Sequence, residues 1–186
     1  MNRKRVGIVV FPDVEVLDFC GPFEVVLVAE TEGVVKATGG LRVVADHGLG
    51  TCPSLDILVV PGGWGTRNEI SNRRLLDWIA ERARQVETLT SVCTGSMLLG
   101  HAGLLDGRRA TTHWRALDWM RQSFPTVTVE DKLHVVEDGH VITSAGISAG
   151  IDMALRVVER YHGHDIALAT ARNMEYAWLE SNARRV

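Results

Sequence analysis

Short apolar runs alternate with segments of helical periodicity along most of this chain, and this alternation restricts the possible folds most strongly. The apolar runs are rich in β-branched residues, as expected of strands buried on both faces. They cover residues 6–11, 25–29, 57–60 and 88–92. The helical patterns cover residues 68–85, 94–105, 148–162 and 165–180. Strands that alternate with helices predict an α/β fold, with a doubly wound, mostly parallel sheet and helices on both faces.

A later pair of runs, 133–136 and 141–143, is separated by a turn that contains Asp138-Gly139. Asp-Gly between two apolar runs predicts an antiparallel hairpin. Ser148 is a candidate N-cap of the helix that follows, and Gly163 is a candidate terminator of that helix. On the last predicted helix, Met174 and Trp178 fall on the apolar face, which favours packing over ligand binding.

The bulk properties indicate one domain over residues 1–186 and exclude several functional classes. The chain is 46% hydrophobic and 23% charged, with a net charge of −3, and no linker divides it. This charge predicts no attraction to nucleic acid or to a membrane surface. No apolar run approaches the ~20 residues of a membrane span, and residues 6–11 are too few for a signal peptide, so a cytoplasmic location is expected.

Cys93 stands where a buried strand meets a run of small residues, Thr94, Gly95 and Ser96. A strand that turns sharply into a helix at a nucleophile is typical of a nucleophile elbow. Such a turn carries the side chain to the carboxyl edge of the sheet, where open α/β sheets bind their ligands. We therefore expect Cys93 to be the reactive centre.

Ionisation of this thiol needs more than the dipole of the following helix. A free thiol with a pKa of about 8.5 is only about 3% ionised at pH 7. Making it mostly ionised takes roughly 3 kcal/mol, whereas a helix dipole contributes at most ~2 kcal/mol. Hydrogen bonds to sulfur must contribute the rest.

Several further residues are candidates for roles beside the thiol. A strand ends in Pro61-Gly62-Gly63, and the backbone N–H groups of Gly63 and Thr94 are candidate oxyanion donors. His113 lies 20 residues after Cys93 and is either a base or orienting group for the thiol or a hydrogen-bonded structural residue. Trp64 and Trp114 either line the pocket or pack against the surface.

Asp18, in an otherwise apolar stretch after the first strand, is either an N-cap or an acid that faces the thiol. An ionised carboxylate there would raise the thiol pKa, so the acid works best protonated, as a proton donor or shuttle. The other two cysteines, Cys20 and Cys52, have no such context and are expected to pack. With Cys93 they form an odd, widely spaced set without a CxxC pair, which argues against a disulfide framework and a zinc site.

Five stretches together resemble the ThiJ/PfpI family of class I glutamine-amidotransferase-like proteins, and most closely its isonitrile-hydrating branch. They cover residues 17–22, 61–63, 91–96, 103–105 together with 110–114, and 149–152. The resemblance implies a flavodoxin-like sandwich, usually a homodimer, with Cys93 as nucleophile, Asp18 as the acid near it, and a small-molecule substrate. It implies neither metal nor organic cofactor. Thr94 stands where the protease-like branch has histidine, which argues against peptidase activity.

The resemblance leaves three functions open. The first is hydration of an isonitrile to an N-substituted formamide, and the second is a glyoxalase- or deglycase-like reaction at the same cysteine. The third is a ligand or oxidation sensor, since the same motifs occur in amidotransferase-like domains of AraC-type regulators. One departure concerns residues 21–24, which run almost directly into the strand at 25–29, where the family has a full helix that helps form the dimer.

Overall fold

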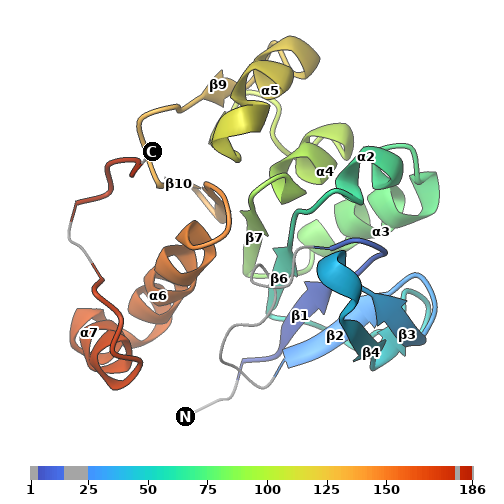
Figure 1. Ribbon diagram of the computed structural model, residues 1–186, viewed down its shortest axis with the longest axis horizontal. Helices are drawn as coiled ribbons and strands as arrows, with labels where there is room; N and C mark the ends of the chain where they lie inside the picture. Colours follow the sequence, from blue (N-terminus) through green and yellow to red (C-terminus); the bar gives the residue numbers. More distant parts are fainter. Residues whose placement is uncertain (1–3, 15–24, 179–180, 186) are drawn as a thin grey trace.

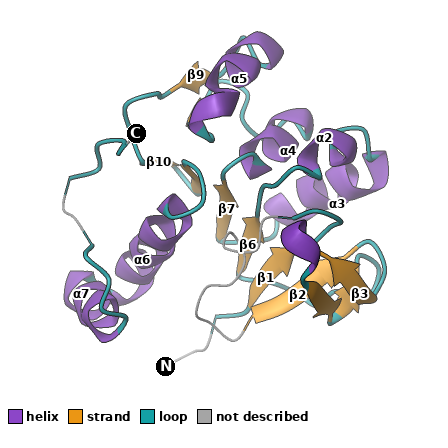
Figure 2. Ribbon diagram, in the orientation of Figure 1, coloured by secondary structure: helices purple, strands orange, loops and turns teal. Residues whose placement is uncertain are grey.

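The computed structural model describes residues 4–14, 25–178 and 181–185 and has a seven-stranded sheet at its centre (Figures 1 and 2). The strand order is β10-β11-β7-β6-β1-β2-β5, and neighbouring strands run parallel except β10 and β11. The bounds of these strands are β1 Val6–Val9, β2 Val25–Ala29, β5 His47–Gly48, β6 Ile57–Val60, β7 Thr88–Val92, β10 Val135–Asp138 and β11 Val141–Ser144.

The three strands β2, β6 and β7 have the bounds that the apolar runs predict, and β1 is two residues shorter than its run. The predicted hairpin is present, with Gly139 at a φ of +64° in its turn. Its first strand, β10, begins two residues later than expected. The preceding residues instead pair with the end of the chain, because Leu133 forms an antiparallel bridge with Ala183.

Helices cover both faces of the sheet. In Figures 1 and 2, α6 and α7 lie on one side of it, and α2, α3 and α4 lie on the other. Packing of α6 is close, since a Cβ on its Gly150 would lie 3.1 Å from a methyl group of Val92 in β7. The bounds are α2 Thr66–Glu69, α3 Arg73–Ala83, α4 Gly95–His101, α5 Leu117–Ser123, α6 Ala149–His162 and α7 His164–Asn173, with 3-10 turns at Thr38–Gly40 and Trp114–Ala116.

The helix predicted over 68–85 is wrong as a single element, because the chain folds there into α2 and α3. The first helix ends at Glu69, and Asn72 caps the second, where its side chain accepts a 3.2 Å hydrogen bond from Leu75 N–H. The helix predicted over 94–105 ends at His101, and the one predicted over 165–180 ends at Asn173. Ser148 stands at the N-cap position of α6 without a side-chain capping bond, and Gly163 ends α6 at a φ of +88°.

Two small sheets were not predicted from the apolar runs. β3 Gly33–Lys36 and β4 Arg42–Ala45 form an antiparallel ribbon, and the two-residue strands β8 Arg109–Ala110 and β9 Thr128–Val129 pair in parallel. These strands are partly exposed, so they lack the continuous apolar character of the central strands.

The direction of winding reverses beside β1. From β1 the chain passes to β2 on one side and later returns to β6 and β7 on the other. Open α/β sheets bind ligands outside the carboxyl ends of their strands at such a switch point. All five residues of β7 are buried, so its end is a rigid support for the residue that follows. Among the described residues, no helix combines the length and apolar character that crossing a membrane requires.

Candidate active site around Cys93

Cys93 directly follows β7 and has a φ of +57°. A non-glycine residue in this left-handed region is uncommon and stores strain, which the surroundings must compensate. Two hydrogen bonds compensate this strain, since the Cys93 N–H donates to the carbonyls of Ser144 and Ala145, at 3.2 and 3.1 Å. The strained turn that a nucleophile elbow requires is therefore present. Cys93 remains 7% exposed.

Two glycines make room for this turn. A Cβ on Gly95 would lie 2.0 Å from the carbonyl oxygen of Val60, and one on Gly62 would lie 2.9 Å from the Cβ of Cys93. Gly62 also approaches Thr94, whose backbone N would lie 2.6 Å from the added atom. The end of β6 therefore packs directly against the elbow, and any side chain at either position would push the two apart.

The carbonyl of Cys93 is held by two hydroxyl groups. Thr112 Oγ1 donates to it at 3.0 Å and Ser96 Oγ at 3.1 Å. Because a peptide group is planar, a fixed Cys93 carbonyl also fixes the direction of the Thr94 N–H on its opposite side. Thr112 and Ser96 therefore set the orientation of the Thr94 N–H, which is the candidate oxyanion donor.

The side chain of Thr94 belongs to a network with Gly63 and Thr66. Gly63 N–H donates to Thr94 Oγ1 at 3.1 Å, and Thr66 Oγ1 donates to the Gly63 carbonyl at 2.7 Å. Gly63 has a φ of +128°, which only glycine adopts readily. The structure thus brings Gly63 and Thr94 together. In this conformation Gly63 N–H is directed at Thr94, and its part in binding an oxyanion stays a prediction.

His113 lies next to the residues that hold the elbow. Its Nδ1 accepts a 3.2 Å hydrogen bond from Arg115 N–H, which assigns the proton of the neutral ring to Nε2. The ring packs against Gly146, where an added Cβ would lie 2.2 Å from Cδ2. Burial lowers the pKa of His113, and Arg115 and Arg184 lower it further. His113 is therefore neutral at pH 7 and has a structural role as cap of the Trp114–Ala116 turn, whereas a role as base stays a prediction.

The remaining candidates are Asp18, two cysteines and two tryptophans. Asp18 and Cys20 lie outside the described residues. Cys52 is buried, and burial raises its thiol pKa, in agreement with a packing role. Trp64 is 65% exposed, with the Arg67 guanidinium 4.2 Å from its ring centroid. Trp114 lines a pocket of about 580 Å³.

Several residues that shape the site were not identified from the sequence. The sequence predicts no separate role for Thr112, although two adjacent hydroxyl residues before a histidine are a usable signal. The carbonyls of Ser144 and Ala145 carry no signal at all, because any residue supplies one. Within the described part of the chain, no group of three or more histidine, cysteine or acidic side chains could hold a metal ion.

Several known proteins are similar to this chain in sequence. A family model described as the DJ-1/PfpI family matches residues 4–160. Isonitrile hydratase from Pseudomonas putida is 38% identical over 182 residues, which cover 93% of this chain and 78% of that protein. The HTH-type transcriptional regulator GbdR from Pseudomonas aeruginosa is 35% identical over 142 residues, 76% of this chain, and the match covers only 38% of the regulator.

A crystal structure of a ThiJ/PfpI family protein from Pseudomonas syringae superposes with a TM-score of 0.88 and 33% identity. It covers 95% of this chain and 76% of that one. The family model spans most of the chain, and the structural match agrees with the sheet order described above. The chain therefore belongs to the DJ-1/PfpI family.

Proposed function

We propose that this protein is a cysteine-dependent hydratase that converts an isonitrile, R–N≡C, into the N-substituted formamide. The observation that carries the proposal is the strained elbow at Cys93, in a chain 38% identical to an isonitrile hydratase over 93% of its length. A cysteine held at such a turn is suited to nucleophilic attack on a small electrophile.

The proposed reaction begins with attack of the Cys93 thiolate on the terminal carbon of the isonitrile. That carbon takes a proton from an acid, for which we propose Asp18, and the product is a thioimidate, Cys–S–CH=N–R. Water then adds to the same carbon, with its oxygen forming the new bond and one proton passing to nitrogen. Loss of the thiolate, with return of the hydroxyl proton to the acid, releases R–NH–CHO, so the sum is one isonitrile and one water giving one formamide.

Two features of the described site support these steps. The Thr94 N–H, whose direction is set through the Cys93 carbonyl, would donate to the hydroxyl oxygen of the adduct as that oxygen loses its proton and gains negative charge. Neutral His113, which carries its proton on Nε2, would serve as a hydrogen-bond donor rather than as a base, because its protonation would place a second positive charge beside Arg115. Neither feature requires a cofactor.

The test is turnover of cyclohexyl isonitrile, followed by proton NMR of the formamide. We expect product from the native protein and none from Cys93→Ala, whereas Cys52→Ala, which alters the other described cysteine, should retain activity. Absence of product from the native protein rejects the proposal. Conversion of methylglyoxal to lactate by the same sample would instead favour a glyoxalase-like enzyme.

A ligand or oxidation sensor is the second candidate, supported by the 35% identity to the regulator GbdR over 76% of this chain. This candidate predicts oxidation of Cys93 to a sulfinic acid by sub-millimolar peroxide, together with absence of turnover. Peptide mass spectrometry before and after peroxide treatment measures it. An unmodified Cys93 under conditions that oxidise an exposed control thiol would reject this candidate.

We also propose the homodimer that the family resemblance implies. Light scattering coupled to gel filtration should give about 41 kDa, twice the chain mass of 20.5 kDa. A mass equal to that of one chain at micromolar concentration would reject it.

A further inference from the structure

Residues 181–185, here called the C-terminal arm, return from α7 to the edge of the molecule beside β10 (Figure 1). The arm pairs with residues 132–135. His134 N–H donates to the Asn182 carbonyl at 2.9 Å, and Arg184 N–H donates to the Lys132 carbonyl at 2.7 Å. The Asn182 side chain adds two bonds to the backbone of Val135, at 2.7 and 3.0 Å. The arm is thus fixed along its length by backbone and amide hydrogen bonds.

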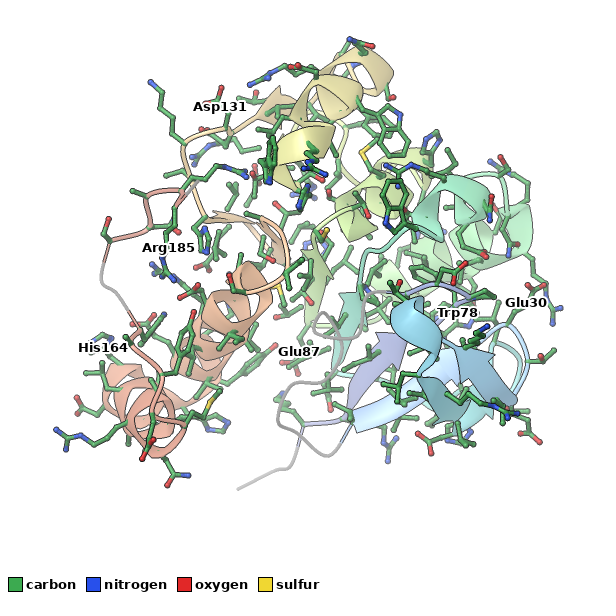
Figure 3. The ribbon with its side chains drawn as sticks, in the orientation of Figure 1. Glu30, Trp78, Glu87, Asp131, His164 and Arg185 are labelled. Carbon is green, nitrogen blue, oxygen red and sulfur yellow. The ribbon has the colours of Figure 1, made fainter. Side chains whose placement is uncertain are left out.

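A buried carboxylate anchors the same arm to α6. Asp152 is 4% exposed, and its Oδ1 accepts a 3.0 Å bond from the guanidinium of Arg185, which Figure 3 labels. Its Oδ2 accepts a 3.1 Å bond from the Tyr176 hydroxyl and lies 3.2 Å from His134 Nε2. Leaving the buried Asp152 carboxylate without these partners would strongly destabilise the fold. Its bond to Arg185 therefore holds the arm in one position.

This position brings Arg184 onto the loop that precedes His113. Its Nη2 lies 2.5 Å from Thr111 Oγ1 and 3.1 Å from the Thr112 carbonyl, both of which accept. Thr111 is held from the other side, because its N–H donates to Thr143 Oγ1 in β11 at 2.9 Å. The guanidinium therefore clamps the 111–112 backbone against the end of the sheet.

The clamped residue is the one that holds the elbow. Thr112 accepts from Arg184 through its carbonyl and donates through its hydroxyl to the Cys93 carbonyl at 3.0 Å. One residue therefore connects Arg184 to the peptide group between Cys93 and Thr94. A shift of Thr112 would change the direction of the Thr94 N–H and the strain stored at Cys93.

Arg184 is also a destabilising residue for a position that needs only packing. Its Nε and Nη1 are enclosed and have no hydrogen-bond partner among the described residues. Burial lowers the pKa of this guanidinium, which shows that its charge is held at a cost. An apolar side chain of similar length would avoid both penalties. Residues that break such local rules are characteristic of functional sites.

We propose that Arg184 is a positioning residue, which acts through Thr112 to hold the Cys93–Thr94 peptide in its reactive orientation. The expected effect on turnover rests on the hydratase function proposed above. The effect on the reactivity of Cys93 does not rest on it, because alkylation needs no substrate.

The experiment compares Arg184→Met, which removes the charge and the donors, with Arg184→Lys, which keeps the charge but loses the forked geometry. Arg73→Met is the matched control, since the Arg73 side chain is 77% exposed and lies outside the site. We measure kcat and KM for cyclohexyl isonitrile, the thermal midpoint, and the pH dependence of Cys93 alkylation by iodoacetamide, quantified by peptide mass spectrometry.

For Arg184→Met we expect kcat to fall by about 10- to 100-fold with KM within about twofold, as for a reacting group displaced by roughly 1 Å. Alkylation of Cys93 at pH 7 should slow and its pH midpoint should rise. The thermal midpoint should stay unchanged or rise. Arg184→Lys should recover part of the rate, and Arg73→Met should match the native protein. A purely structural role predicts the reverse, namely a lower thermal midpoint with an unchanged kcat and an unchanged pH midpoint.

The two proposals fail in distinguishable ways. If the native protein makes no formamide, the hydratase proposal fails, and alkylation alone then decides the role of Arg184. Unchanged alkylation in a folded Arg184→Met protein overturns it. If that variant does not fold, Thr112→Val, which removes the hydroxyl that contacts Cys93, decides instead. Slower alkylation in Thr112→Val supports the proposal, and native alkylation overturns it.

Discussion

The hydroxyl of Thr112 donates a 3.0 Å hydrogen bond to the carbonyl of Cys93. Both residues are buried, and Ser96 supplies the second bond to the same carbonyl. The contact joins the loop before His113 to the nucleophile elbow, so the geometry at the cysteine depends on a loop outside β7 and α4.

Replacement of Thr112 by valine should therefore reduce turnover while the protein stays folded. The loss of one buried hydrogen bond costs about 1–3 kcal/mol of stability, and a free Cys93–Thr94 peptide should lower kcat by about tenfold. Thr112→Ser retains the hydroxyl and should keep most of the activity. Steady-state kinetics and urea denaturation measure both effects, and equal kcat values for the valine and serine variants would contradict the role of this bond.

Gly62→Ala should lower the stability of the protein and the reactivity of Cys93 more than the same substitution at an open position. The added methyl group would lie 2.9 Å from the Cβ of Cys93 and 2.6 Å from Thr94 N, both in buried residues. Overpacking of this kind costs about 1–3 kcal/mol. We expect lower stability and slower alkylation of Cys93. Gly50→Ala, at a position with no atom within 4 Å of the added group, is the control. A Gly62→Ala protein with native alkylation kinetics would show that β6 does not constrain the elbow.

Acid should destabilise the protein through its partly buried histidines. Burial is the largest cause that lowers the pKa of His101, His113 and His134 below 6.5. A base with a lowered folded-state pKa binds fewer protons in the native than in the unfolded state. Stability is therefore fully present above pH 6.5 and falls as the pH drops from there towards the folded-state pKa values.

The measurement is the free energy of unfolding in urea between pH 7.5 and pH 5. His113→Gln removes one titrating group, so its stability should fall less steeply over this range than that of the native protein. A steeper fall in the variant would contradict the assignment of His113 as a neutral, partly buried base.

Asn72→Ala should weaken α3 without affecting the reaction. The Asn72 side chain accepts from Leu75 N–H at the start of this helix, and loss of such a cap costs about 1 kcal/mol. Asn72→Asp retains a hydrogen-bond acceptor and should lose less stability than Asn72→Ala. Chemical denaturation measures the stability and the isonitrile assay measures activity. A fall in kcat for Asn72→Ala would show that α3 and the site are coupled, against expectation.

The elements that could be predicted are those whose residues share one environment along their whole length. Residues 25–29, 57–60 and 88–92 form strands with the predicted bounds, because central strands read as continuous apolar runs. The division of residues 68–85 into α2 and α3 was missed, since one apolar face continues across Asn72 and the cap is decided by local hydrogen bonding.

The candidate site divides in the same way. Cys93 was identified because a buried strand, one reactive residue and a run of small residues follow one another in the chain. No local pattern indicates that Arg184 contacts Thr111, which lies 73 residues away. Gly63 N–H was expected to face a substrate, and only the folded arrangement directs it to Thr94 Oγ1.

By itself the sequence determined the alternation of the central strands with helices, the position of Cys93 at a strand-to-helix turn and the glycines that the turn requires. These are consequences of side-chain period, size and backbone freedom, which act between near neighbours in the chain. Only the tertiary structure decided which hydroxyl holds the Cys93 carbonyl and which arginine holds that loop. A hydrogen bond tolerates a displacement of a few tenths of an ångström, and such precision between distant segments exists only once the sheet, its loops and the C-terminal arm are packed together.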